Sequence, residues 1–155
     1  MTTRRKTLLS AGAAVALAGC TGVLFGEDRM DARGDITVVI DGEAVDLTAD
    51  RFQSEHASND SAAFHLHAGE EEWFMEGADP VTAGEAIDLL PHFAFELDDG
   101  DPVVTVDGTT YDGTTAETSV AVLVDGESVD PMSYTLRDGD SVRLEIETAA
   151  GDGST

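Results

Sequence analysis

Three times along this chain, a run rich in β-branched residues is followed by Asp-Gly and then by a second, alternating run. Asp and Gly tolerate the positive φ angles of a two-residue turn, and a period of two lets one face of each run enter a core. Each unit therefore predicts a β-hairpin, and the repetition reflects either an internal duplication or the repeated use of one favourable turn. The three units span residues 36–47, 103–112 and 120–130.

A single helix is predicted between the first and second hairpins. Thr82 is the expected N-cap, because Glu85 follows three residues later as in a capping box, and Pro91 ends the helix. A strand-rich order with one short helix predicts an α+β domain of β-hairpins, with two sheet halves that flank the helix. Four further runs alternate as strands do, at 62–67, 71–76, 93–97 and 142–146.

The first 19 residues have the pattern of an export signal, with a basic start, an apolar run and a small-residue ending. Arg4 and Arg5 resemble a twin-arginine signal, and the Leu-Ala-Gly-Cys sequence that ends at Cys20 resembles a lipoprotein box. We therefore expect cleavage before Cys20 and lipidation of its thiol. The alternatives are an unmodified cysteine and a permanent transmembrane helix, which needs roughly 20 apolar residues where this run supplies about half.

Export and lipidation predict both the domain organisation and the location of the protein. A lipid on Cys20 would hold the domain at the outer face of the cell membrane after transport by the twin-arginine pathway. The membrane is then one partner, through the anchor, and a surface protein is a second expected partner. The expected segments are a signal peptide at 1–19, a lipid-anchored tether at 20–34, a single domain at 35–148 and a disordered tail at 149–155.

The excess of acidic residues indicates which partners the protein can bind and the salt concentration at which it folds. Removal of the signal would leave five arginines, no lysine and all 32 acidic residues, a formal charge of −27. No basic patch for a phosphate backbone can be assembled, so nucleic acid is excluded as a partner. Such a charge also suits a disordered chain. The alternating apolar runs instead favour the folded protein of a halophile, in which molar salt screens the repulsion.

His65 and His67 are the residue pair with the clearest chemical potential. Residues i and i+2 of a strand point to the same face, and imidazole is a common ligand for zinc and copper. Further ligands for Cu or Zn are expected from Glu76 on the next strand, from His56 in the preceding loop, or from His92 after the helix.

The same alternation allows two other interpretations of this pair. Phe64 and Leu66 would occupy the core while both imidazoles face solvent, or the imidazoles would contact a partner protein. Convergence of the two rings on the Glu76 carboxylate, within about 5 Å, distinguishes metal binding from these alternatives, because metal bonds are near 2 Å.

The chain has no recognisable catalytic motif. It lacks a Gly-x-Ser-x-Gly elbow, a phosphate loop, a dinucleotide fingerprint and a zinc-protease helix. Its single cysteine, Cys20, precedes the domain, so the domain has neither a disulfide nor a thiol nucleophile. A non-catalytic protein is therefore expected. Asn59 begins an Asn-x-Ser sequon and is an expected glycosylation site of an exported protein.

Two resemblances add to these expectations. Residues 122–146 resemble the closing part of β-grasp proteins, which implies β-grasp-like halves; the sulfur carriers of that fold end in Gly-Gly, whereas this chain ends in Gly-Ser-Thr. The whole domain is similar to uncharacterised small exported lipoproteins of halophilic archaea, with a His-x-His strand at 65–67 and an acid at Glu76. Phe74 stands where that group often has His. That group has no assigned activity to carry over. The expected function is a lipid-anchored binding or interaction module, and the alternative is a copper- or zinc-binding protein.

Overall fold

The computed structural model describes residues 30–149 except 57–60 and 68. The expected signal peptide, with Arg4 and Arg5, lies outside the described residues, as do Cys20, Asn59 and the part of the expected tail after residue 149. Among the described residues, no helix is both long enough and apolar enough to cross a membrane.

The larger sheet is built around β1 (Ala32–Ile40), which has different neighbours on its two sides. Its second half pairs in parallel with β10 (Val142–Thr148), and its first half pairs antiparallel with β4 (Glu72–Met75). The strand order is β3-β4-β1-β10-β8-β9, with β3 at His65–Leu66, β8 at Thr118–Val124, β9 at Glu127–Ser128, and β2 (Glu43–Ala44) paired to the end of β1.

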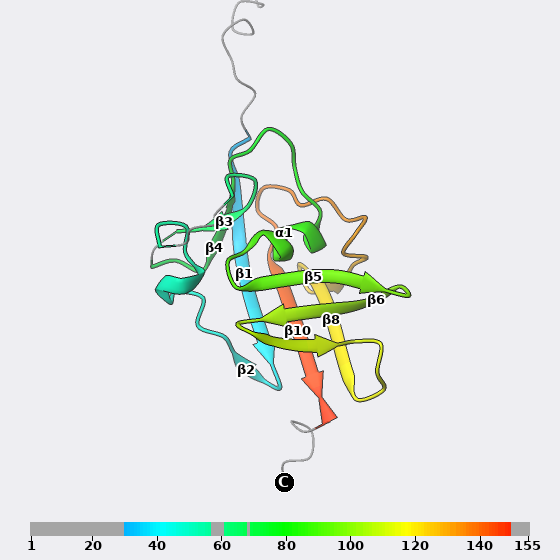
Figure 1. The fold of residues 1–155 in the computed structure, drawn as a ribbon. Coiled ribbons are helices and arrows are strands. Elements are labelled where there is room, and N and C mark those ends of the chain that lie inside the picture. Colours follow the sequence, from blue (N-terminus) through cyan, green and yellow to red (C-terminus); the bar gives the residue numbers. More distant parts are fainter. Residues whose placement is uncertain (1–29, 57–60, 68, 150–155) are drawn as a thin grey trace, which may run out of the picture.

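The smaller sheet is an antiparallel meander of β5 (Phe93–Asp98), β6 (Asp101–Val106) and β7 (Thr109–Asp112). Its strands run across β1, β10 and β8 (Figure 1), and α1 (Ala83–Leu89) packs against β5. One continuous apolar core joins the two sheets, the helix and the short 3-10 helix η2 (Asp50–Phe52). This arrangement confirms a strand-rich domain with one short α-helix, while the β-grasp-like halves stay a prediction.

The three predicted hairpins are confirmed by their turn angles. Asp41, Asp107 and Asp125 have φ values of 51°, 49° and 52°, and the glycine after each is also at positive φ, as a two-residue turn between twisted strands requires. A fourth turn with the same conformation, at Asp99 and Gly100, joins β5 to β6. This turn was not among the predicted hairpins.

The predicted capping box is confirmed, and the first strand begins a little before the expected start of the domain. The Glu85 amide donates to Oγ1 of Thr82 over 3.2 Å, and the Thr82 amide donates to Oε2 of Glu85 over 2.8 Å. The first strand begins at Ala32, three residues before the expected boundary at Asp35. Ala32 is buried and pairs with Met75 on β4, so part of the expected tether belongs to the sheet.

The contact between β1 and the turn before β10 is unusually close. The indole Nε1 of Trp73 donates to the carbonyl oxygen of Asp140 over 3.1 Å, and both residues are buried. A Cβ atom on Gly34 would lie 2.1 Å from that carbonyl oxygen and 2.7 Å from the indole ring. Only glycine therefore fits at this point of β1.

Candidate metal centre

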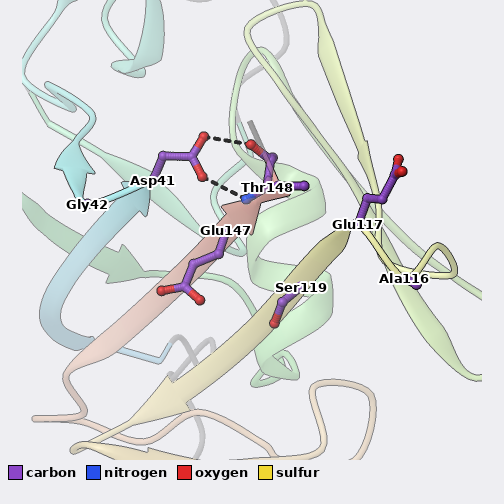
Figure 2. A pocket seen from close by; sticks show the side chains of 8 residues that line it. Asp41, Gly42, Ala116, Glu117, Ser119, Glu147 and Thr148 are labelled. Atoms are coloured by element: carbon purple, nitrogen blue, oxygen red, sulfur yellow. Dashed lines mark hydrogen bonds between the residues drawn. The ribbon is translucent and has the colours of Figure 1, made fainter. Parts of the chain in front are cut away.

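An open hollow of about 500 Å³ lies where β1 turns into β2, beside the ends of β8 and β10. Figure 2 shows the carboxylate of Asp41 facing Thr148, whose amide and hydroxyl donate to it over 2.7 and 2.9 Å. The side chains of Glu117 and Glu147 point in different directions (Figure 2). Among the described residues, these carboxylates do not belong to a group that could hold a metal ion.

The short strand pair β3 and β4 brings the predicted histidines to a different place. His65 lies opposite Phe74 in the antiparallel register. Alternation sends Phe64, Leu66 and the β4 residues Trp73 and Met75 into the core, where each is fully buried. The imidazoles lie on the opposite face of this pair.

The expectation that both imidazoles face solvent is wrong for His65. Its side chain is 6% exposed, whereas that of His67 is 39% exposed. The ring of Phe74 is stacked on His65 with the ring centroids 6.1 Å apart, and it meets His67 edge-on at 4.6 Å. This aromatic ring helps to cover a face that the sequence pattern alone assigns to water.

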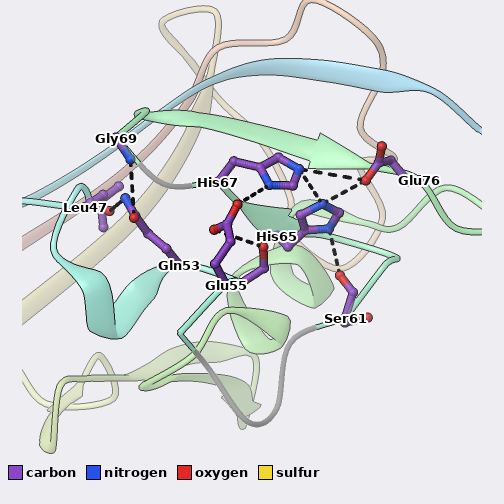
Figure 3. A network of polar contacts seen from close by, with 9 residues as sticks. Leu47, Gln53, Glu55, Ser61, His65, His67, Gly69 and Glu76 are labelled. Atoms are coloured by element: carbon purple, nitrogen blue, oxygen red, sulfur yellow. Dashed lines mark hydrogen bonds and ion pairs between the residues drawn. The ribbon is translucent and has the colours of Figure 1, made fainter.

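Three ligand atoms converge on one point between β3 and the end of β4 (Figure 3). Nε2 of His65 lies 3.2 Å from Nε2 of His67 and 2.9 Å from Oε2 of Glu76. Nε2 of His67 lies 3.9 Å from the same carboxylate oxygen. All three atoms are within 4.8 Å of one another, which meets the predicted criterion for metal binding.

The other nitrogen of each ring is held by a group that can only accept a hydrogen bond. Nδ1 of His65 lies 2.9 Å from the carbonyl oxygen of Ser61, and Nδ1 of His67 lies 2.9 Å from Oε1 of Glu55. A carbonyl and a carboxylate have no proton to give, so both Nδ1 atoms must be the donors. In the neutral imidazoles, both Nε2 atoms then carry lone pairs.

This assignment makes the cluster electrostatically incomplete. Two Nε2 lone pairs and one carboxylate oxygen face each other with no hydrogen to share between the neutral rings. Three acceptors at this spacing repel unless a cation lies among them, either an added proton on one ring or a metal ion.

Glu55 is a member of the site that sequence reasoning missed. It precedes His67 by twelve residues and lies in the segment after η2. The Ser54 amide donates to the Leu66 carbonyl oxygen over 2.9 Å, which ties this segment to β3. No motif in the sequence marks Glu55, because its position depends on that contact between a loop and a strand.

Buried Gln53 completes the attachment of this segment. Its side-chain amide donates to the Leu47 carbonyl oxygen over 3.3 Å, and its Oε1 accepts from the Gly69 amide over 3.3 Å. The two bonds connect the chain before η2 with the chain after β3 (Figure 3). The carboxylate of Glu55 is thereby held beside His67.

The structure does not bring the other two predicted ligands into the cluster. His56 directly follows Glu55 in the chain, but its Nε2 lies 3.7 Å from the carboxylate of Asp50. His92 is exposed, has φ of 65°, and meets the ring of Phe52 edge-on at 6.3 Å. Among the described residues, the group that converges consists of His65, His67 and Glu76.

No protein-family model, curated protein or solved structure matches this chain. The resemblance to exported lipoproteins therefore stays a prediction from the sequence. A functional assignment has to rest on the chemistry of the side chains described above.

Proposed function

We propose that this protein binds one transition-metal ion, Zn²⁺ or Cu²⁺, through Nε2 of His65, Nε2 of His67 and the carboxylate of Glu76. The observation that carries the proposal is the 3.2 Å separation of two Nε2 atoms whose rings already donate from Nδ1. A divalent cation placed among the three acceptors turns a repulsive contact into three favourable bonds.

The distances between the three ligand atoms suit Zn²⁺ or Cu²⁺. Bonds of about 2.0–2.1 Å at a tetrahedral angle place two nitrogen ligands about 3.3 Å apart. The observed separation of 3.2 Å is close to that value, and the distances of 2.9 and 3.9 Å to Oε2 of Glu76 bracket it. Small side-chain rotations would equalise the three distances.

The outer contacts and the donor types support the same choice. Metal-bound histidines usually donate their second nitrogen to a carboxylate or a backbone carbonyl, and this site has one of each, in Glu55 and Ser61. Imidazole favours zinc and copper, whereas calcium and magnesium prefer a full set of oxygens. The expected ion is therefore a transition metal, although acidic side chains are abundant in this chain.

The proposed location follows from the N-terminal pattern. A lipid on Cys20 and export by the twin-arginine pathway would display the site on the outer face of the membrane of a halophile. The protein would then be a non-catalytic binding module whose ligand is the metal. A surface protein partner is compatible with this proposal.

Calorimetric titration of Zn²⁺ and Cu²⁺ into the full chain in molar sodium chloride tests the assignment. All samples carry Cys20→Ser, because the thiol would compete for both metals. His67→Ala removes one ligand, and its side chain is partly exposed. We expect the affinity for the metal to fall by about 100-fold or more. This exceeds the 10–100-fold loss that is typical when a residue hydrogen-bonded to a ligand is removed.

His56→Ala and His92→Ala are the matched controls, because each removes an imidazole outside the cluster. They should bind the metal as the parent protein does. Absence of binding at high micromolar metal, or equal losses in all three histidine variants, would contradict the proposed function.

A further inference from the structure

We propose that the metal held by His65, His67 and Glu76 keeps one coordination position for a small external ligand, water or a monoanion. The site would then be an exchangeable centre and not a closed structural one. This inference rests on the proposed function and adds that the bound metal can exchange an external ligand.

The cluster offers fewer protein ligands than a closed metal site needs. Structural zinc sites are closed by four protein ligands, whereas sites with three keep the fourth position for water or another small molecule. Among the described residues, three ligand atoms converge here. Phe74, whose side chain touches both imidazoles from β4, has no ligand atom to add.

The carboxylate of Glu55, which contacts His67, cannot close the site. Oε1 of Glu55 lies 2.9 Å from Nδ1 of His67. The two nitrogens of an imidazole point in different directions from the ring, so a carboxylate bound at Nδ1 is directed away from a metal on Nε2. Glu55 therefore orients His67 without entering the coordination sphere.

The three ligand side chains differ in their exposure to solvent. The side chain of His65 is 6% exposed, while those of His67 and Glu76 are 39% and 48% exposed. The ion would be covered on the His65 side and accessible from the side of the other two ligands. A small molecule can reach it there without any movement of the sheet.

The net charge of the metal and its protein ligands determines which external ligands are favoured. Two neutral imidazoles and one carboxylate leave a divalent ion with one net positive charge. A monoanion at the fourth position would neutralise it, whereas a dianion would leave an excess negative charge beside the carboxylate of Glu55. Small monoanions are therefore the expected class.

Cobalt(II) substitution with azide as the probe tests this inference. The full chain with Cys20→Ser is loaded with Co²⁺ in molar sodium sulfate, which avoids chloride as a competing ligand. Visible absorption of the cobalt then reports its coordination while azide is added at neutral pH. We expect a saturable spectral change that fits one azide per bound cobalt and is lost in His67→Ala.

The outcomes separate this inference from the proposed function. If neither Zn²⁺ nor Cu²⁺ binds in the calorimetric titration, both fail, because no metal then occupies the cluster. If Co²⁺ binds but azide leaves its spectrum unchanged, the metal site stands and the open position is refuted. An azide response of the same size in His67→Ala would show cobalt bound elsewhere and would also overturn the inference.

Discussion

Nδ1 of His67 and Oε1 of Glu55 lie 2.9 Å apart, so a residue of the segment after η2 determines which nitrogen of the histidine following β3 faces the candidate metal. The carboxylate accepts from Nδ1 and leaves Nε2 with its lone pair. The histidine is thus prepared for a cation before any cation binds.

Glu55→Ala should weaken Zn²⁺ binding by about 10–100-fold, because the imidazole of His67 loses the partner that orients it and raises its basicity. Glu55→Gln should recover part of the loss, since an amide oxygen still accepts a hydrogen bond but carries no charge. Calorimetric titration measures both variants. Glu71→Ala removes an exposed carboxylate near the same strands and is the control; equal affinities in Glu71→Ala and Glu55→Ala would contradict the orienting role.

Gly34→Ala should destabilise the fold by about 2–4 kcal/mol, through overpacking and loss of a buried hydrogen bond. The new Cβ would collide with the Asp140 carbonyl oxygen and with the ring of Trp73, which are bonded to each other. Trp73 is the single tryptophan, so its fluorescence during urea unfolding in molar salt reports the change. Asp35→Ala, at an exposed neighbour, is the control; a Gly34→Ala variant as stable as that control would show that the strand can shift at no cost.

Alkaline pH should destabilise the protein through Tyr134. Burial raises the pKa of its phenol, and the hydrogen bond to Asp140 and the negative charge of that carboxylate raise it further. Because the folded-state pKa lies above the unfolded value of about 10, this contribution is complete below that pH and is lost as pH rises through the folded-state pKa.

The comparison that checks this expectation is between Tyr134→Phe and Tyr111→Phe, which change the two tyrosines of the chain in turn. Unfolding midpoints measured from neutral to strongly alkaline pH should fall less steeply in Tyr134→Phe than in the parent. Tyr111→Phe should keep the parental slope. Parallel curves for all three proteins would remove Tyr134 as the cause.

Salt should stabilise the fold strongly, because a formal charge of −24 for the whole chain repels itself in the compact state. The Debye length falls from about 10 Å at 0.1 M to about 3 Å at 1 M, so most of this repulsion is screened at molar sodium chloride. Thermal unfolding followed by circular dichroism should give a midpoint that rises across this range. A midpoint independent of sodium chloride would contradict the halophilic interpretation.

Local sequence predicted the parts of the fold that depend on a few neighbouring residues. The turns at Asp41, Asp107 and Asp125 follow from the φ angles that Asp-Gly allows, and the start of α1 follows from Thr82 and Glu85. The turn at Asp99 and Gly100 has the same chemistry. It was not predicted, because acidic residues surround it and the alternating run before it is short.

The candidate site also has a part that the sequence predicted and a part that it did not. The shared face of His65 and His67 follows from the geometry of a strand, and the sequence alone also indicated Glu76 as a partner. The sequence pattern did not indicate the burial of His65 or the contact from Glu55.

The amino-acid sequence by itself determined three hairpins, one capped helix and a pair of histidines on one face. Each of these depends on dihedral preferences and spacings within a few residues. The tertiary structure alone decided that β1 lies beside β10 and that the segment carrying Glu55 lies against β3. Those contacts join distant parts of the chain, and they form only when the whole apolar core closes and brings them together.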